Sequence, residues 1–220
     1  MRTLAILPIK SFSHAKQRLR HELSAADRRA LVDAMFADVL VALRRVPALE
    51  QIVVVSGDRV AQRIGAGYGA TIVEDDERGH NSAATKGIEA ALEDGIERVL
   101  LVPGDCPLLD PKEVEELLSR PAAGERSALI VPDRHGTGTN ALLLAPPDAL
   151  APSFGPDSRR RHEADAEAAG VAAEVVEVSS LAFDVDTPDD LEALQRRLTE
   201  IRGGAAHTRG MLNQLMRARS

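Results

Sequence analysis

Three aspartates in this chain stand where carboxylates could hold a metal ion. Asp105 follows a short apolar run at residues 99–102, which predicts a buried strand that a Pro-Gly pair ends. Asp184 and Asp186 lie two residues apart in a second apolar stretch, so an extended chain would turn both side chains to one face. Carboxylates at strand ends suit Mg²⁺, which commonly bridges protein carboxylates and substrate phosphates. The alternative for Asp105 is a helix cap, because a helical pattern begins a few residues later.

A cluster of basic side chains follows the first apolar run, Thr3 to Pro8. Lys and Arg at the end of a strand can hold a triphosphate and stabilise the negative charge that grows as a phosphoryl bond breaks. We therefore expect a catalytic role for Lys10, Lys16 and Arg18 beside Asp105, and none for His14. The alternative is a solvated basic loop. The potential cations of this segment are Lys10, His14, Lys16, Arg18 and Arg20.

Further segments carry groups that could recognise a ligand. Asn81 and Ser82 stand at the expected start of a helix, where they could cap it or read the edge of a base or ribose. Residues 134–140 form a Gly-rich loop with two threonine hydroxyls, although such a loop can also be a plain hairpin. Residues 154–158 open a helix whose first N–H groups would make an anion site.

The elements that must position these groups alternate along the chain. Short apolar runs are followed by amphipathic helical patterns, which predicts an α/β fold with a largely parallel sheet. We expect one domain over residues 1–202. The tail at residues 203–220 is rich in Gly and Arg, so it is either a frayed terminus or a helix that binds a partner. The expected strands are Thr3 to Pro8, Gln51 to Ser56, Thr71 to Val73, Val99 to Val102, Ser127 to Val131, Ala141 to Ala145 and Glu174 to Val178.

The composition bounds the class of protein. The 220 residues are 44% hydrophobic and 28% charged with a net charge of -7, which is typical of a globular chain without affinity for nucleic acid. The chain lacks both an apolar leader and the roughly 18 apolar residues that a membrane span needs, so we expect a cytoplasmic protein. Cys106 is the single cysteine, which excludes an internal disulfide, and we expect a small core or loop residue there in preference to a nucleophile.

Six short motifs occur together in order over about Leu4 to Leu198, and the set resembles the phosphoenolpyruvate or 2-phospho-L-lactate guanylyltransferases of deazaflavin coenzyme biosynthesis. The Gly-Thr-Gly-Thr motif followed by Phe-Gly-Pro-Asp-Ser is the most specific part, and Cys106 replaces a more usual apolar residue. The motifs are Pro8-Ile9-Lys10, Ala15-Lys16-Gln17-Arg18-Leu19, Gly104-Asp105-Cys106-Pro107, Gly136-Thr137-Gly138-Thr139, Phe154-Gly155-Pro156-Asp157-Ser158 and Asp184-Val185-Asp186-Thr187-Pro188.

The resemblance implies a Rossmann-like α/β/α nucleotidyltransferase sandwich whose sheet is mostly parallel with one reversed strand. It implies transfer of GMP from GTP to the phosphate of a small phosphorylated carboxylic acid, with release of pyrophosphate. That phosphate is already ionised, so no general base is required and catalysis would rest on positioning and charge neutralisation. We favour phosphoenolpyruvate over 2-phospholactate as the acceptor, because the Ala- and Arg-rich composition looks bacterial and the resembled bacterial enzymes use it.

The same resemblance assigns the site. Mg²⁺ would be held by Asp105 and Asp186 with Asp184 in support, and Thr139, Gly155 and Ser158 would grip the acceptor carboxylate. A second copy of the chain or a downstream pathway enzyme is a further possible partner. Three alternatives stay open: another nucleotidyltransferase, a nucleotide-sugar-dependent glycosyltransferase with Asp184 and Asp186 as its Asp-x-Asp motif, and a non-catalytic nucleotide-binding module.

Overall fold

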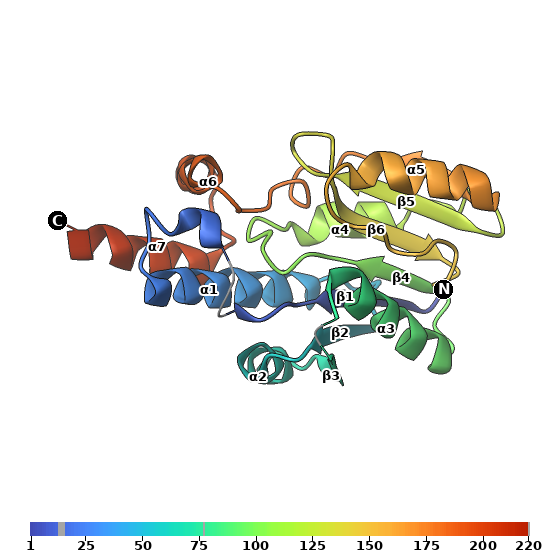
Figure 1. Cartoon of the computed structure of the whole chain (residues 1–220), viewed down its shortest axis with the longest axis horizontal. Coiled ribbons are helices and arrows are strands. Elements are labelled where there is room, and N and C mark those ends of the chain that lie inside the picture. The colour runs from blue at the N-terminus through green and yellow to red at the C-terminus, as the bar shows by residue number, and fades with distance from the viewer. Residues whose placement is uncertain (13–15, 77, 220) are drawn as a thin grey trace.

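The computed structural model describes residues 1–12, 16–76 and 78–219, which form a seven-stranded sheet between two layers of helices (Figure 1). The strand order is β3-β2-β1-β4-β6-β5-β7, and β6 is antiparallel to both of its neighbours while the other neighbouring strands are parallel. The expected mostly parallel sheet with one reversed strand is confirmed. The strands are β1 Thr3–Pro8, β2 Gln51–Ser56, β3 Thr71–Glu74, β4 Arg98–Leu101, β5 Ser127–Pro132, β6 Thr139–Ala145 and β7 Ala172–Val175.

Helices cover both faces of this sheet. One layer contains α1 Ala25–Leu43, α2 Arg59–Gly67, α4 Pro111–Leu118, α6 Pro188–Glu200 and α7 Ala206–Arg219, and the other contains α3 His80–Glu93 and α5 Ser158–Ala169. A 3₁₀ turn, η2 Gln17–Leu19, precedes α1. None of the helices within the described ranges is long and apolar enough to cross a membrane.

The apolar runs of the sequence are continuous because the central strands are buried on both sides. In β1, Leu4 and Ile6 pack into the core layer beneath α3 and α5, whereas Ala5 and Leu7 pack into the layer beneath α1 and α4. All four side chains are at most 1% exposed. Alternate side chains of one strand therefore pack into the two hydrophobic cores on opposite faces of the sheet.

The order in which the chain adds strands to the sheet reverses at β1. The chain runs outward through β2 and β3 on one side and through β4 on the other, so the loops after β1 and β4 diverge and leave a crevice between them. Gly104 follows β4 and touches the segment after β1, since a Cβ at this position would overlap Ile9. This close approach brings the basic loop and Asp105 to the same edge.

Two local expectations from the sequence are wrong. Residues 182–187 are irregular, so Asp184 and Asp186 do not lie on a strand. Helix α3 begins at His80 with Gly79 at its N-cap, so Asn81 and Ser82 lie inside the first turn and cap nothing. Gly79 has a φ of 127°, a conformation that glycine adopts readily and that lets the helix start there.

The C-terminal tail forms the helix α7, which packs on α1, so the expected alternative of a frayed terminus is wrong. The carboxylate of Asp38 in α1 is buried and accepts hydrogen bonds from the backbone N–H groups of His207, at 3.0 Å, and Thr208, at 2.8 Å. These are first-turn donors of α7, which have no partner within the helix. Leu212 then buries against the core, being 3% exposed.

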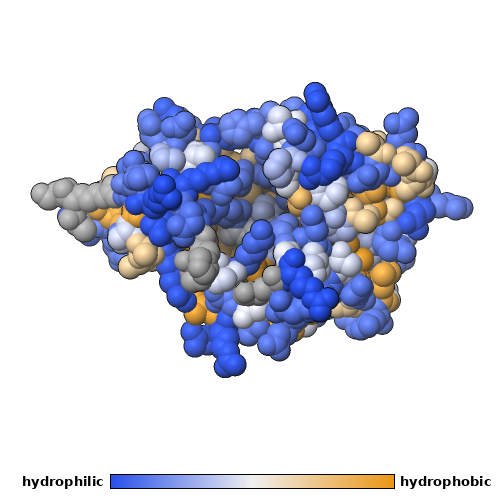
Figure 2. All heavy atoms as spheres, in the orientation of Figure 1, coloured by the Kyte–Doolittle hydropathy of each residue, from blue (hydrophilic) through white to orange (hydrophobic). Residues whose placement is uncertain are grey.

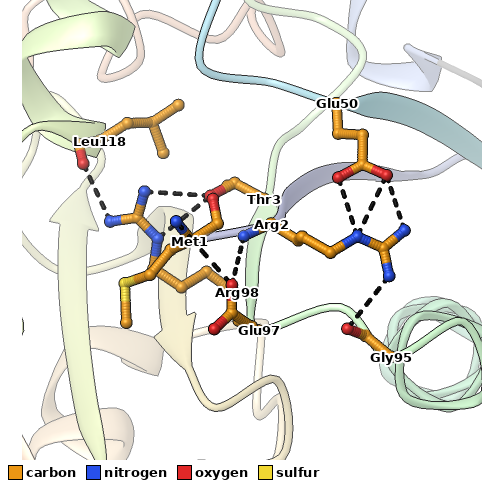
Figure 3. Close-up of polar contacts among 8 residues, drawn as sticks. All are labelled: Met1, Arg2, Thr3, Glu50, Gly95, Glu97, Arg98 and Leu118. Atoms are coloured by element: carbon orange, nitrogen blue, oxygen red, sulfur yellow. Dashed lines mark hydrogen bonds and ion pairs between the residues drawn. The ribbon is translucent and has the colours of Figure 1, made fainter.

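The amino ends of the strands are joined by ion pairs and hydrogen bonds at the edge away from the crevice (Figure 3). Arg2 pairs with Glu50 at 2.6 Å, which ties β1 to the start of β2. Arg98 donates to the hydroxyl of Thr3 at 3.0 and 3.1 Å and to the carbonyl of Leu118 at 2.9 Å. These contacts therefore connect the strands at their amino ends, and the loops at their carboxyl ends take no part in them.

A pair of glycine substitutions tests how closely α3 lies on the sheet. A Cβ on Gly87 would overlap Ile6 and lie 3.1 Å from Val55, whereas a Cβ on Gly67 meets nothing within 4 Å. We expect Gly87→Ala to lower the free energy of unfolding by about 1–3 kcal/mol, and Gly67→Ala to raise it by about 0.5–1 kcal/mol. Urea unfolding of both variants measures the difference, and equal effects would contradict the packing described.

Candidate active site

A cavity of about 750 Å³ opens at the carboxyl ends of β1 and β4. Figure 2 shows a largely hydrophilic face that is hollowed near its middle. The volume suits a nucleotide-sized ligand. Residues from both sides of the crevice line it, and those that the sequence predicted as site residues are Lys10, Lys16, Asp105, Thr139, Gly155, Ser158, Asp184 and Asp186.

Lys16 lies at the centre of the charged groups in this cavity. Its side chain is 6% exposed, and its ammonium donates to the carboxylate of Asp105 and, at 2.7 Å, to that of Asp186. Burial lowers the pKa of Lys16, but the two carboxylates outweigh burial and the net pKa is raised. Lys16 is therefore a charged cation that joins the loop after β1 to the segments after β4 and before α6.

Asp184 lies beside this group without contacting the ammonium through a hydrogen bond. Burial, and then the charge of Asp105, raise the pKa of Asp184 to about 6. The side-chain amide of Asn140 opposes this shift by donating to Asp184 Oδ1 at 3.2 Å, and it also donates to the carbonyl of Leu181 at 2.9 Å. Asp184 thus titrates closer to neutrality than an ordinary aspartate.

The donor set of this group fits a hard divalent cation, because carboxylate oxygens are the preferred ligands of Mg²⁺. Asp105 and Asp186 already converge on one cation, the Lys16 ammonium. Across residues 1–12, 16–76 and 78–219, no three or more His, Cys, Asp or Glu side chains are arranged to hold a metal. A metal at this point would therefore share its coordination between these carboxylates and a bound ligand.

The remaining basic residues are placed unequally. Lys10 is exposed and lines the cavity. Arg18 lies on η2, is exposed, and is absent from the cavity wall. His14 falls outside the described residues. The structure therefore brings Lys10 and Lys16 to the cavity and leaves Arg18 on the outer side of the same loop.

A group of hydrogen-bond donors lines the cavity at the starts of β6 and α5. The hydroxyl of Ser158 accepts a hydrogen bond from the backbone N–H of Thr139 at 2.8 Å, while the Ser158 N–H donates to the carbonyl of Gly155 at 3.1 Å. The Arg159 N–H also donates within the protein, to Thr137 at 3.2 Å. These two backbone N–H groups at the start of α5 are therefore occupied within the protein, whereas the Ser158 hydroxyl still has a hydrogen to donate.

Asn81 and Ser82 are predicted substrate contacts that lie outside the cavity wall. The Asn81 amide is occupied on both sides by the backbone of Phe154: its oxygen accepts from the N–H at 2.8 Å and its nitrogen donates to the carbonyl at 3.2 Å. Their neighbours His80 and Ala83 line the cavity instead. Because α3 begins at His80, one residue before Asn81, a correct prediction of the helix start would have pointed to His80 and Ala83.

His162 is a site neighbour that sequence reasoning missed. It is fully buried, and its Nε2 accepts a hydrogen bond from the backbone N–H of Ser153 at 2.9 Å, while its Nδ1 lies 3.0 Å from the hydroxyl of Thr139. Burial lowers the pKa of His162 to about 4. The imidazole is therefore neutral at physiological pH.

The expectation that Cys106 is a small core residue is confirmed. The thiol is fully buried and donates to the carbonyl of Leu181 at 3.3 Å. Burial, followed by the charge of Asp105, raises the pKa of Cys106 well above its ordinary value. A protonated, buried thiol is a poor nucleophile, although it lies next to Asp105.

Known proteins match this chain over nearly its whole length. A family model described as guanylyl transferase CofC like matches residues 3–216. A phosphoenolpyruvate guanylyltransferase of Conexibacter woesei is 53% identical over 99% of this chain and 98% of its own, and one of Sphaerobacter thermophilus is 38% identical over 88% and 93%. A 2-phospho-L-lactate guanylyltransferase of Methanothermobacter thermautotrophicus is 32% identical over 98% and 92%.

Solved structures share the fold. A provisionally named nucleotide-diphospho-sugar transferase from Desulfovibrio desulfuricans G20 has a TM-score of 0.73 and 18% identity, and the match covers 97% of this chain and 95% of that one. A nucleotidyl transferase from Methanothermobacter thermautotrophicus has a TM-score of 0.64 and 16% identity over 90% and 98%. At this identity the likeness concerns the arrangement of the sheet and helices.

The buried histidine makes stability depend on pH. The pKa of His162 falls from about 6.5 in the unfolded chain to about 4 in the folded one, so between these values the unfolded chain binds the proton more readily. We expect this residue to lower the free energy of unfolding by about 2–3 kcal/mol as the pH falls from 6.5 to 4. His162→Gln should remove that dependence.

Urea unfolding at pH 7, 5.5 and 4.5 measures the effect, with His135→Gln as the control because His135 is exposed. The His135 variant should keep the slope of the parent chain. Parallel pH profiles for the parent and His162→Gln would contradict the burial of a neutral imidazole.

Proposed function

Because the chain belongs to the guanylyl transferase CofC like family, we propose that it transfers GMP from GTP to the phosphate of phosphoenolpyruvate and releases pyrophosphate, in the synthesis of a deazaflavin coenzyme. The enzyme class is that of the nucleotidyltransferases, so the glycosyltransferase and the non-catalytic module are set aside. The observation that carries the proposal is the Lys16 ammonium bound to Asp105 and Asp186 in the cavity at the ends of β1 and β4.

The proposed reaction balances without proton transfer. A phosphate oxygen of the acceptor forms a bond to the α-phosphorus of GTP, and the bond from that phosphorus to the β-phosphate bridging oxygen breaks. Pyrophosphate leaves with the electron pair. Both the nucleophile and the leaving group are anions, so the protein must align them and neutralise their charge. The proposed reaction therefore needs no general base.

Cationic groups at the β1 end would meet the triphosphate. Lys16 and Lys10 line the cavity there, and a bound triphosphate offers the Lys16 ammonium a second set of anionic partners. Asp105 and Asp186 would hold Mg²⁺ with Asp184 in support. When bound, the ion neutralises charge on the phosphates. The proposed reaction gives no role to Arg18, Asn81 or Ser82, because they are not on the cavity wall.

The acceptor would bind at the donor group near α5. The hydroxyls of Thr139 and Ser158 and the N–H of Gly155 are suited to a carboxylate, and Gly155 has a φ of 126° that glycine adopts readily. Phosphoenolpyruvate is favoured over 2-phospholactate because the relative with 53% identity is named for it, while the relative named for 2-phospho-L-lactate is 32% identical.

The assay supplies protein, Mg²⁺ and GTP with phosphoenolpyruvate, 2-phospholactate or 3-phosphoglycerate, and measures pyrophosphate release. We expect release that depends on the acceptor, with the highest kcat/KM for phosphoenolpyruvate. CTP and ATP in place of GTP serve as controls for the base. Release without any acceptor, or faster release with CTP, would contradict the proposed guanylyl transfer.

Lys16→Ala tests the central cation. We expect a loss on the order of a hundredfold in kcat, because one preorganised charged donor to the leaving pyrophosphate is removed. Lys112→Ala is the matched control, since Lys112 is exposed on α4 and away from the cavity. A Lys16→Ala variant within a few-fold of the parent chain would count against the assignment.

A further inference from the structure

A buried imidazole lies directly behind the proposed acceptor site without reaching the cavity itself. His162, in the second turn of α5, is fully buried and is absent from the cavity wall. Its two ring nitrogens contact two segments that do line the cavity, Thr139 at the start of β6 and the loop at residues 153–155. A single side chain therefore connects three elements around the site.

The hydrogen bonds fix the tautomer of this imidazole. The N–H of Ser153 donates to Nε2, so Nε2 carries no hydrogen. In the neutral ring the hydrogen then lies on Nδ1, which donates to the hydroxyl oxygen of Thr139 at 3.0 Å. The Thr139 hydroxyl keeps its own hydrogen for another acceptor. Ser158 has the same arrangement, since its oxygen accepts from the Thr139 N–H.

The loop at residues 153–155 is held by further contacts. The ring of Phe154 lies between the rings of His162 and His80 in two edge contacts, with centroids 5.3 and 5.1 Å apart. The amide of Asn81 pairs with both backbone groups of Phe154. Gly155, which follows, is therefore placed by α3 on one side and by α5 on the other.

We propose that His162 is a positioning residue that sets affinity for the acceptor, by holding the Thr139 hydroxyl and the 153–155 loop so that their donors face one anion. The inference rests on the proposed function of this site. A neutral imidazole is suited to the task because it accepts from one segment and donates to the other at the same time. Its lowered pKa keeps that neutral form at physiological pH.

Substitutions of His162 can distinguish a positioning role from simple core packing. A phenylalanine of similar size would fill the space and keep the edge contact with Phe154, yet it would leave the Ser153 N–H without its acceptor and Thr139 without its donor. Glutamine can place an oxygen near the position of Nε2, and asparagine an amide near that of Nδ1. Each amide variant therefore restores one of the two hydrogen bonds.

The experiment compares His162→Phe, His162→Gln and His162→Asn in the pyrophosphate assay. We expect His162→Phe to raise the KM for phosphoenolpyruvate by about tenfold or more and to leave the KM for GTP within twofold of the parent value. The two amide variants should recover part of the acceptor affinity. His207→Phe, at an exposed histidine on α7 that is not on the cavity wall, should change neither KM.

Ser158→Ala serves as the reference that separates two failures. If the parent chain shows no acceptor-dependent release, the proposed function fails. If Ser158→Ala raises the acceptor KM and His162→Phe does not, or if His162→Phe raises both KM values equally, the positioning role alone is overturned. A fall in Tm with both KM values unchanged gives His162 a purely structural role and also overturns it.

A measurement on the unmodified chain covers the case in which His162→Phe does not fold. ¹⁵N NMR of histidine-labelled protein should show His162 neutral with hydrogen on Nδ1 at pH 7, and its Nδ1–H resonance should shift when phosphoenolpyruvate is added in the presence of GTP without Mg²⁺. Hydrogen on Nε2, or a resonance that the acceptor leaves unchanged, would overturn the proposal.

Discussion

The ammonium of Lys16 carries a positive charge inside the protein, between the carboxylates of Asp105 and Asp186. A charge with 6% of its side chain exposed is stable there because its partners are charged and within hydrogen-bond distance. Each of the three residues comes from a different segment: the loop after β1, the end of β4 and the approach to α6. The contact therefore requires β1 and β4 to be neighbours and α6 to return to the same edge.

The carboxylates around Lys16 would also repel the phosphates of a nucleotide. Asp105, Asp184 and Asp186 line a cavity in which Lys16 and Lys10 are the cationic side chains among the described wall residues. The raised pKa of Asp184 reduces the excess of negative charge near neutrality, but a triphosphate brought to the carboxylates would still be repelled. A divalent cation removes that repulsion, which is the physical reason to place Mg²⁺ at the carboxylates in the proposed reaction.

Much of the site could be predicted from sequence because strand ends are local features. Asp105 follows an apolar run and a Pro-Gly pair, and the alternation of strands and helices brings its strand beside β1. Asn81 was misplaced because its partner, Phe154, lies 73 residues away and the helix start is set by Gly79. His162 gives no local signal, since its role arises from two hydrogen bonds to separate segments.

In the proposed reaction, the choice among acceptors depends on the part of the cavity that Thr139, Gly155 and Ser158 line. Phosphoenolpyruvate and 2-phospholactate present the same carboxylate and phosphate and differ at the carbon between them, so a site can distinguish them by about 1–3 kcal/mol through fit alone. Such a difference is sensitive to the position of a few donors. In the proposed site those donors belong to Thr139, Gly155 and Ser158, whose segments are held by the buried His162 and the half-buried Asn81, neither of which lines the cavity. If the proposed site is correct, acceptor preference depends on residues behind the cavity wall as well as on those that line it.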